Sequence, residues 1–389
     1  DGTGDTSAQF KWQLGLGSSR VYYGALRETG TDTSTSTAAF AVSLQGGVLE
    51  LGAADLARST GTGAGQLDMF YGGGFSAHGA DRTVTLNGGA ALAFGDTGIR
   101  FIHNNYPLTF GSQTANATAV LANDLSLGGS GTRYLATVRG VGTGPEGRIA
   151  GKLTGGAGFQ LVGLTLPDGS AVPAGTLELA NAANTFTGAV EIIGGTLRVT
   201  GNIPYHATNA VTVRSGGALG GSGLVDRRVV VDPGGMLVPG ASAGQLRLGR
   251  DLSFAGIYAW ELTALKDDAD AGAAGMFYDQ VLMNGGALTM TNPTLRLVLP
   301  SGKGPGEDPF WCSYHEWTFL TGFGSFSMTG PGHIEGYDGL LGEFDVDDTR
   351  QGSLVLTWTP TPSAEAEIPE PASALMILAG TGLLARRRA

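Results

Sequence analysis

The sequence predicts an all-β protein, a right-handed parallel β-helix of stacked coils (a β-solenoid), followed by a short C-terminal transmembrane helix. A Gly-Gly-x-Leu unit recurs at residues 194–197, 216–219 and 234–237, in steps of 22 and 18 residues. A step near 20 residues is typical of solenoids. Short runs of alternating apolar residues follow these units, and an uncharged C-terminal segment precedes three arginines.

The alternating runs predict strands with one buried face. Leu197 and Val199 share one face, and Val211 and Val213 do the same in the next run, with polar residues between them. Stacked coils would join these faces into one core, with strands about 4.8 Å apart. The glycines fit tight corners, because glycine adopts positive φ at no steric cost.

Looser copies of the unit occur at residues 46–51, 88–94 and 285–290. We therefore expect the solenoid to span residues 41–300. At about 20 residues per coil, it would contain about 13 coils and measure about 60 Å. The alternative is a set of Gly-Gly hairpin turns in an antiparallel β protein, which would not need a step near 20.

The remaining segments are predicted as follows. Residues 1–40 form an irregular N-terminal cap segment. Pro145 and Pro173 are expected at solenoid corners, and the sequence LKDDADAGAAG at 265–275 is expected to be an exposed loop. Residues 301–360 form C-terminal strands that cap the solenoid, and 361–367 form a polar linker.

The predicted cap is rich in aromatic residues in a chain that is only 8% aromatic. Bulky rings on the last strands could cover the end of the core; a carbohydrate-stacking platform is the alternative. The residues concerned are Trp311, Tyr314, Trp317, Phe319, Phe323 and Phe326.

The stretch from 175 to 200 carries a family resemblance. Thr176–Leu179 is followed by the turn Asn184-Thr185-Phe186-Thr187-Gly188 and then by Gly-Gly-Thr-Leu. This order resembles the autotransporter-associated β-strand repeat, and the similarity continues more weakly through residues 216–244. The resemblance implies a secreted or surface β-solenoid, and it implies no catalytic residues.

Composition excludes some function classes. Glycine contributes 67 of 389 residues, charged residues only 15%, and the net charge is −11. A nucleic-acid partner is therefore not expected, since phosphate binding needs a basic surface. Cys312 is the single cysteine, so an intrachain disulfide cannot form.

The C-terminal stretch predicts a membrane-held sorting signal. Fourteen residues without a charge, 372–385, lie between Pro369-Glu370-Pro371 and Arg386-Arg387-Arg388. They are short of the roughly 20 residues that span a bilayer, and the arginines would hold the tail in the cytoplasm. An ordinary C-terminal membrane anchor is the alternative.

Residues 368–389 closely resemble the PEP-CTERM sorting signal, in which Pro-Glu-Pro, a short apolar segment and terminal arginines follow one another. The resemblance implies processing by an exosortase near Pro369-Glu370-Pro371, after transient anchoring in the inner membrane. It also implies a Gram-negative bacterium that makes exopolysaccharide. Because such a signal presupposes Sec export, and Asp1 is not a start residue, we expect an N-terminal export signal in the precursor.

Candidate catalytic and metal-binding groups are few, and we predict no catalytic residue, cofactor or metal site. The five histidines are scattered, without metal-ligand spacing, and the neighbours His315 and Glu316 are interpreted as a chance pair. The two acidic clusters are interpreted as solvated loops rather than calcium sites, and Cys312 as a small buried hydrophobe. The histidines are His78, His103, His206, His315 and His333; the clusters are Asp267, Asp268 and Asp270, and Asp345, Asp347 and Asp348.

The sequence therefore predicts an exported, non-catalytic structural or adhesin-like surface protein, associated with the extracellular polysaccharide matrix. The alternative is a β-helix protein that binds or degrades polysaccharide. A structural protein would have no catalytic cluster, whereas a polysaccharide-acting protein would gather acidic and aromatic residues in a groove.

Overall fold

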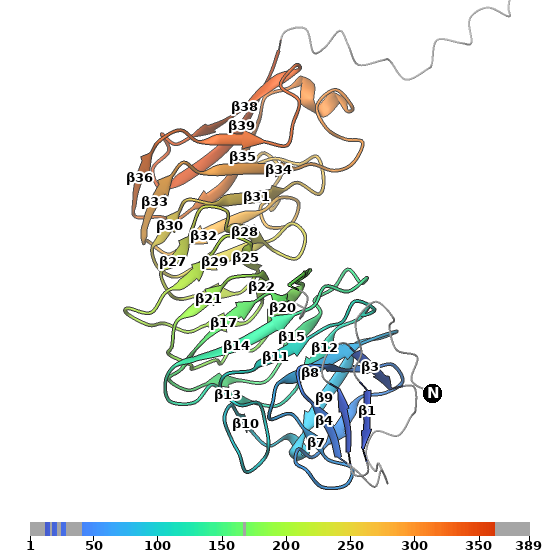
Figure 1. The fold of residues 1–389 in the computed structure, drawn as a ribbon. Coiled ribbons are helices and arrows are strands. Elements are labelled where there is room, and N and C mark those ends of the chain that lie inside the picture. The colour runs from blue at the N-terminus through green and yellow to red at the C-terminus, as the bar shows by residue number, and fades with distance from the viewer. Residues whose placement is uncertain (1–11, 16–17, 22–24, 29–40, 166–168, 362–389) are drawn as a thin grey trace, which may run out of the picture.

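The computed structural model describes residues 12–15, 18–21, 25–28, 41–165 and 169–361. These residues form an all-β structure in which parallel strands stack coil upon coil, as in a β-solenoid (Figure 1). The predicted transmembrane helix and sorting signal at 368–389, and most of the predicted N-terminal cap segment, lie outside the described residues. Among the residues that are described, helix occurs only as two short 3-10 turns, η1 (Asn87–Gly89) and η2 (Pro309–Cys312), and no helix is long and apolar enough to cross a membrane.

The largest sheet contains one strand from each of twelve successive coils, and every neighbouring pair in it is parallel. Its strands are β3 (Ala25–Glu28), β5 (Val48–Leu51), β8 (Gly73–Ala77), β11 (Pro107–Phe110), β14 (Thr132–Thr137), β17 (Gly158–Val162), β21 (Val190–Ile192), β24 (Val211–Val213), β27 (Val229–Val231), β30 (Leu252–Phe254), β33 (Ala287–Thr291) and β36 (Ser325–Thr329).

A second, 11-stranded parallel sheet receives the next strand of each coil. Its strands are β6 (Leu56–Arg58), β9 (Arg82–Leu86), β12 (Ala119–Leu121), β15 (Gly147–Ile149), β20 (Thr176–Leu179), β22 (Gly195–Val199), β25 (Gly217–Gly221), β28 (Met236–Pro239), β31 (Ile257–Glu261), β34 (Thr294–Val298) and β37 (His333–Glu335).

The third side of the solenoid is divided between two shorter sheets. One contains β10 (Leu92–Ala93), β13 (Leu125–Ser126) and β16 (Leu153–Thr154). The other contains β23 (Asn202–Ile203), β26 (Leu224–Val225), β29 (Gln245–Leu248), β32 (Gln280–Met283), β35 (His315–Thr321), β39 (Ser353–Pro360) and β38 (Gly342–Asp347).

Smaller elements complete the fold at the N-terminal end and between β17 and β20. A four-stranded sheet contains β1 (Trp12–Gly15), β2 (Ser18–Val21), β4 (Ala41–Leu44) and β7 (Leu67–Asp68), and a hairpin contains β18 (Leu164–Thr165) and β19 (Ala171–Val172). Pro145 and Pro173 lie in connections beside β15 and β19, outside the strands, as expected of corner residues.

The register confirms the predicted stacking between 175 and 248. Leu197 pairs with Leu219 and Leu219 with Leu237, so the leucines of the three repeat units form one row in the second sheet. Val211 pairs with Val229 in the largest sheet. All of these side chains are buried, with at most 1% of their surface exposed. Each coil thus adds apolar surface to the core of the next, which is where the solenoid gains its stability.

The predicted coil length was wrong outside this stretch. The offset between paired residues is 18 for Val213 and Val231 but 38 for Met290 and Met328. Between residues 41 and 300 the largest sheet therefore has ten strands, not about 13. In the longer coils, the additional residues form loops at the corners. Such loops are tolerated because lengthening a loop adds little to the entropic cost of closing it.

The looser Gly-Gly units also differ from the prediction. The units at 46 and 285 precede strands of the largest sheet, whereas those at 194, 216 and 234 begin strands of the second sheet. The unit at 88–94 starts in the 3-10 turn η1 and leads into β10 on the third side of the solenoid. What the units share is a corner: Gly216 and Gly234 have φ of 86° and 80°, which favours glycine.

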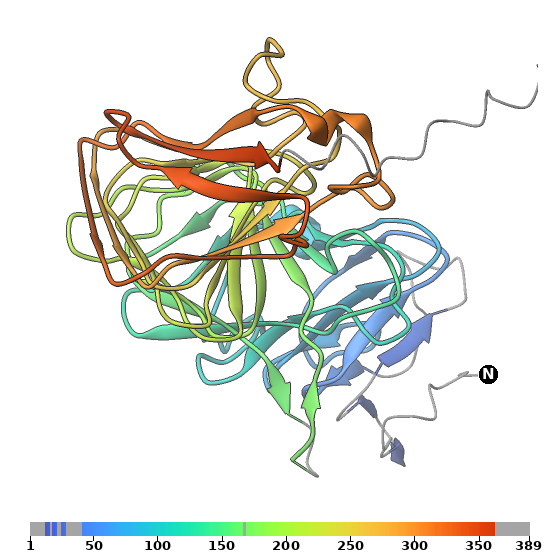
Figure 2. The same cartoon turned by 90° about the horizontal axis from the view of Figure 1, so that it is seen from above.

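The last coils carry a large aromatic cluster. Trp260, Trp317 and Trp358 are fully buried and Trp311 is 2% exposed. Here the sheet on the third side ends in antiparallel order, because β39 pairs with both β35 and β38. These strands lie at the C-terminal end of the stack (Figures 1 and 2), and Trp317 and Trp358 belong to β35 and β39.

Candidate functional site

Two exposed tyrosines lie at a corner near the N-terminal end of the solenoid. Phe70 and Tyr71 occupy the turn between β7 and β8, while Arg100, His103 and Tyr106 lie in the connection between β10 and β11. We call these five residues the aromatic corner. Tyr71 is 45% exposed and Tyr106 is 39% exposed.

The rings of the aromatic corner meet edge to face. The ring centroids of Tyr71 and Tyr106 are 5.9 Å apart with an angle of 80° between the planes, and those of Phe70 and His103 are 5.3 Å apart at 67°. Such T-shaped pairs are favourable contacts between aromatic rings. The two tyrosines therefore form adjoining, nearly perpendicular surfaces.

Backbone hydrogen bonds fix the two segments against each other. The Met69 N–H donates to the Arg100 carbonyl at 3.2 Å, and the His103 N–H donates to the Phe70 carbonyl at 3.0 Å. Phe101 and Ile102, between these contacts, are fully buried in the core. The exposed rings thus project from an anchored backbone.

Within the aromatic corner, Arg100 packs against the Phe70 ring and has an uncommon backbone conformation. Its φ is 53°, in the left-handed region that residues other than glycine rarely adopt. Its Nε and Nη2 donate to the two oxygens of Asp68 at 3.1 and 2.7 Å, and its guanidinium lies 4.7 Å from the Phe70 ring centroid. The hydrogen bond to Asp68 raises the pKa of Arg100, so a neutralised ion pair lies under the rings.

Sequence reasoning missed this site. The sequence predicted exposed aromatic residues in the C-terminal cap instead. Tyr71 and Tyr106 are brought together because the coil between them is 35 residues long, with Phe75 paired to Phe110. The available signal was the clustering of Phe70-Tyr71 and of His103 to Tyr106 at successive corners.

A second polar cluster joins the 265–275 loop to the C-terminal strands. His315 Nδ1 lies 2.5 Å from Asp267 Oδ2, and its Nε2 lies 2.5 Å from the Phe310 carbonyl. Both ring nitrogens therefore lie within hydrogen-bond distance of an oxygen acceptor. The Phe310 ring stacks on His315, with centroids 3.6 Å apart. His315 is buried and bound to Asp267, whereas its sequence neighbour Glu316 binds Arg350 and Tyr314, so each of the two has partners of its own.

The same loop is less free than predicted. Asp268 accepts hydrogen bonds from the Thr318 N–H at 2.9 Å and from the Tyr278 hydroxyl. Trp317 Nε1 donates to the Lys266 carbonyl at 2.7 Å. Although parts of the loop are exposed, Asp267 and Asp268 attach it to β35, which explains why acidic residues gather here. Burial and the bond to Asp268 raise the pKa of Tyr278.

Asp347 receives hydrogen bonds from Thr349 and Arg350, and Asp345 is an exposed residue of β38. Cys312 is half-buried, not fully buried. In the described ranges no group of three or more His, Cys, Asp or Glu side chains is placed to hold a metal ion. Pro369, Glu370, Pro371 and Arg386 to Arg388 lie outside those ranges.

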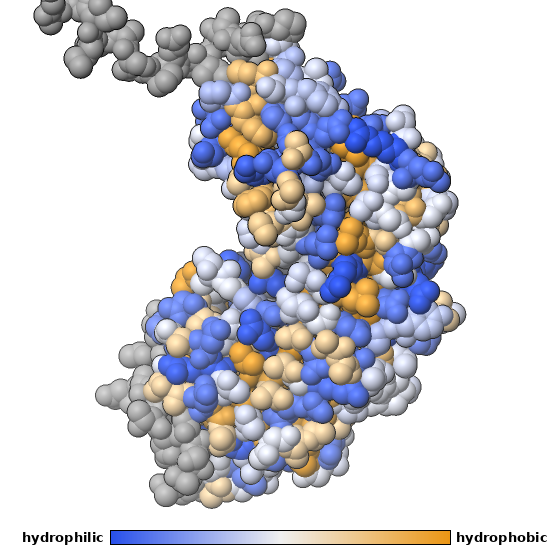
Figure 3. Space-filling model, turned by 180° about the vertical axis from the view of Figure 1, so that it is seen from behind, coloured by the Kyte–Doolittle hydropathy of each residue, from blue (hydrophilic) through white to orange (hydrophobic). Residues whose placement is uncertain are grey.

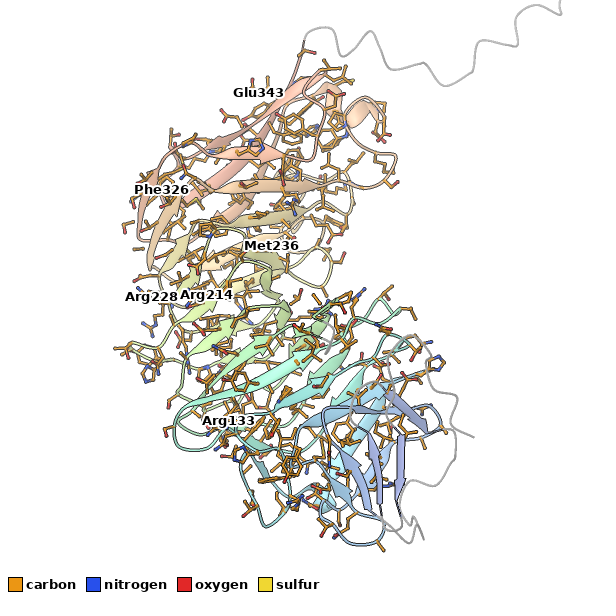
Figure 4. The ribbon with its side chains drawn as sticks, viewed as in Figure 1. Arg133, Arg214, Arg228, Met236, Phe326 and Glu343 are labelled. Carbon is orange, nitrogen blue, oxygen red and sulfur yellow. The ribbon has the colours of Figure 1, made fainter. Side chains whose placement is uncertain are left out.

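A cavity of about 200 Å³ opens between the last coil and the β38–β39 hairpin, near Phe326 in Figure 4. Its walls are mainly apolar side chains from β33, β34 and β36, with Asp345, Asp348 and His333 also lining it. Seen from behind, the molecule is also hollowed on one side about half-way along the stack (Figure 3), and polar and apolar residues are mixed over that face.

The sequence matches no protein-family model, and no curated protein matches it.

Proposed function

We propose that this chain is an exported, non-catalytic structural or adhesin-like surface protein. Its body is a right-handed β-solenoid. An exosortase recognises Pro369-Glu370-Pro371, the segment 372–385 is held transiently in the inner membrane with Arg386 to Arg388 on the cytoplasmic side, and the body associates with extracellular polysaccharide. The first support is the sequence of the tail, whose order of motifs resembles a PEP-CTERM signal.

The continuous stack of twelve parallel strands is the main support for a structural role. Eleven steps of about 4.8 Å give a sheet about 53 Å long. Each coil is buried against its neighbours, so the stack resists bending and can hold a surface away from the cell. This architecture needs no disulfide, in keeping with the single cysteine.

Polysaccharide binding is the second candidate, and the aromatic corner favours it. Exposed rings on an anchored backbone are a suitable surface for sugar rings, which have apolar C–H faces. The two candidates are compatible, since a structural protein of a polysaccharide matrix must hold on to that matrix.

The sorting proposal is tested by replacing Pro369, Glu370 and Pro371 together with alanine in a polysaccharide-producing host. We expect the wild-type chain to lose about its last 20 residues and to reach the surface. The variant should stay uncut in the inner membrane. If intact mass and fractionation show both chains at full length in one membrane fraction, the tail is a plain anchor and the proposal fails.

A further inference from the structure

We propose that the aromatic corner is a binding site for neutral polysaccharide, with Tyr71 and Tyr106 as its stacking surfaces. This inference rests on the proposed function in so far as the protein meets polysaccharide at all. It adds the site and the ligand class, a chain of uncharged hexopyranose units.

The geometry of the tyrosines suits a sugar ring. Their planes are 80° apart and their centroids 5.9 Å apart, with both rings partly exposed. One ring can lie under the C–H face of a pyranose while the other touches its edge. Tyrosine gives this contact area with only two side-chain torsions to order, so binding costs little conformational entropy.

Polar groups beside the rings can meet the hydroxyl groups of the sugar. His103 Nδ1 accepts a hydrogen bond from the Asn105 N–H at 3.4 Å. In the neutral ring the proton is then on Nε2, which leaves that nitrogen as a donor. The phenol groups of Tyr71 and Tyr106 can both donate and accept. A few polar groups around an apolar surface are what fixes the orientation of a ligand.

Charge favours a neutral ligand. Arg100 is the cation of the aromatic corner, and Asp68 already binds it through both oxygens. The corner therefore offers no uncompensated positive charge to a uronate or sulfate group. With a net charge of −11, the chain as a whole would repel an anionic polymer.

The site is rigid before any ligand arrives. The strained backbone of Arg100, with its φ of 53°, is held by the Asp68 ion pair and by the Met69 and His103 backbone hydrogen bonds. Strained non-glycine residues often mark functional positions. A preformed surface loses less entropy on binding than one that must be ordered.

The other exposed tyrosines in the described part of the chain lack this arrangement. Tyr205 is 54% exposed, but the Arg250 guanidinium lies 4.4 Å from its ring centroid and covers one face. Tyr314 is 53% exposed, and its hydroxyl donates to Glu316 at 2.7 Å. Tyr205 is therefore a matched control, exposed to a similar extent but without a second tyrosine beside it.

The test is affinity electrophoresis of the full chain in gels containing hydroxyethylcellulose, dextran or alginate. We expect at least one neutral polymer to retard the wild type and alginate not to. Tyr71→Ala and Tyr106→Ala should each lower the association constant about tenfold, as expected for the loss of one aromatic contact. Tyr205→Ala should bind as the wild type does, and Tyr71→Phe, which keeps the ring, should retain most binding.

A second measurement uses the wild type alone, so its result does not depend on whether a variant folds. Nitration of the wild type by tetranitromethane, followed by peptide mass analysis, should modify the exposed tyrosines Tyr71, Tyr106, Tyr205 and Tyr314. The bound neutral polymer should protect only Tyr71 and Tyr106.

Three results would overturn the inference: no retardation by either neutral polymer, retardation by alginate alone, or equal binding by wild type, Tyr71→Ala and Tyr106→Ala. These outcomes are separate from the sorting test. A chain that is cut and exported but does not bind refutes only the aromatic corner. A chain that binds in the gel but is neither cut nor exported refutes only the proposed function.

Discussion

At the scale of single residues, Arg227 ties three coils together from inside the solenoid. It is fully buried, and its guanidinium donates to the carbonyl oxygens of Pro204, Gly188 and Phe186 at 2.6, 2.5 and 2.7 Å. The Phe186 ring centroid lies 4.8 Å away. Burial lowers the pKa of Arg227 to about 10, so the side chain remains charged at neutral pH and is stabilised by carbonyl dipoles.

Replacing this arginine should strongly destabilise the fold. Arg227→Met would leave three carbonyl groups without their donor, and we expect the free energy of unfolding to fall by about 3 kcal/mol. Urea denaturation followed by circular dichroism measures this. Arg228→Met is the control, because Arg228 is an exposed neighbour and should change stability by less than about 0.5 kcal/mol. Equal losses in the two variants would contradict this role.

Asp279 makes stability depend on pH. It is 2% exposed, and desolvation raises its pKa to about 8, although the N–H groups of Glu261 and Gly244 donate to it. In the unfolded chain it ionises near its ordinary value of about 4. Between these values the folded state binds the extra proton, so the free energy of unfolding should fall as pH rises from about 4 to about 8.

The Asp279→Asn variant should lack this part of the pH dependence. We expect the wild type to lose at least about 1 kcal/mol more stability than the variant between pH 5 and pH 8. Urea titrations of both proteins at the two pH values give the difference. Parallel pH profiles would show that Asp279 is ionised in the folded protein.

At the scale of elements, side chains replace strands where a coil lacks one. No strand of the third side lies between β16 and β23 among the described residues. There Asn184 accepts from the Leu153 N–H at 2.8 Å and donates to the Asn202 carbonyl at 2.8 Å, bridging the two neighbouring coils. The turn Asn184 to Gly188, which carries the repeat resemblance, therefore connects neighbouring coils through the side chain of Asn184.

Ion pairs also connect coils on the outside. Arg214, at the edge of the solenoid in Figure 4, bonds to Glu191 at 2.7 Å in the preceding coil and to Asp232 at 2.8 Å in the following one. The bond to Arg214 lowers the pKa of Glu191. All three side chains are substantially exposed, so solvent screening leaves each pair a contribution of less than about 1 kcal/mol.

The pairing of Asp267 with His315 should hold the 265–275 loop on β35. A double-mutant cycle with Asp267→Ala and His315→Ala should give a coupling energy of about 1–2 kcal/mol, because the two side chains are in contact and largely buried. Lys266 and Asp270, in the same loop, form an exposed pair at 2.8 Å. The matching cycle on them should give less than about 0.5 kcal/mol. Equal coupling in the two cycles would rule out a special role for His315.

The sequence predicted those parts of the fold in which the pattern is local. Leu197, Leu219 and Leu237 could be aligned because the coils between them are short and regular. Contacts across long coils could not be predicted: Tyr71 meets Tyr106, and Asp267 meets His315 across 48 residues. Coil length varies because corners accept insertions without disturbing the strands, so spacing along the chain says little about which corners adjoin.

At the scale of the whole molecule, the stack is curved. The N-terminal strands are displaced to one side of the later coils when the molecule is seen from above (Figure 2). The aromatic corner lies near one end of the stack and the C-terminal strands near the other, where the chain continues toward residues 362–389 (Figure 1). The aromatic corner and the C-terminal strands are therefore at opposite ends of the stack.

We propose that this solenoid works outside the cell, bound to polysaccharide. The most direct measurement is antibody labelling of intact, polysaccharide-producing cells that express the chain, combined with intact mass of the labelled protein. We predict labelling of unpermeabilised cells and of the separated matrix, by a protein that has lost its C-terminal arginines. Labelling only after permeabilisation, with the tail intact, would contradict the proposed location outside the cell.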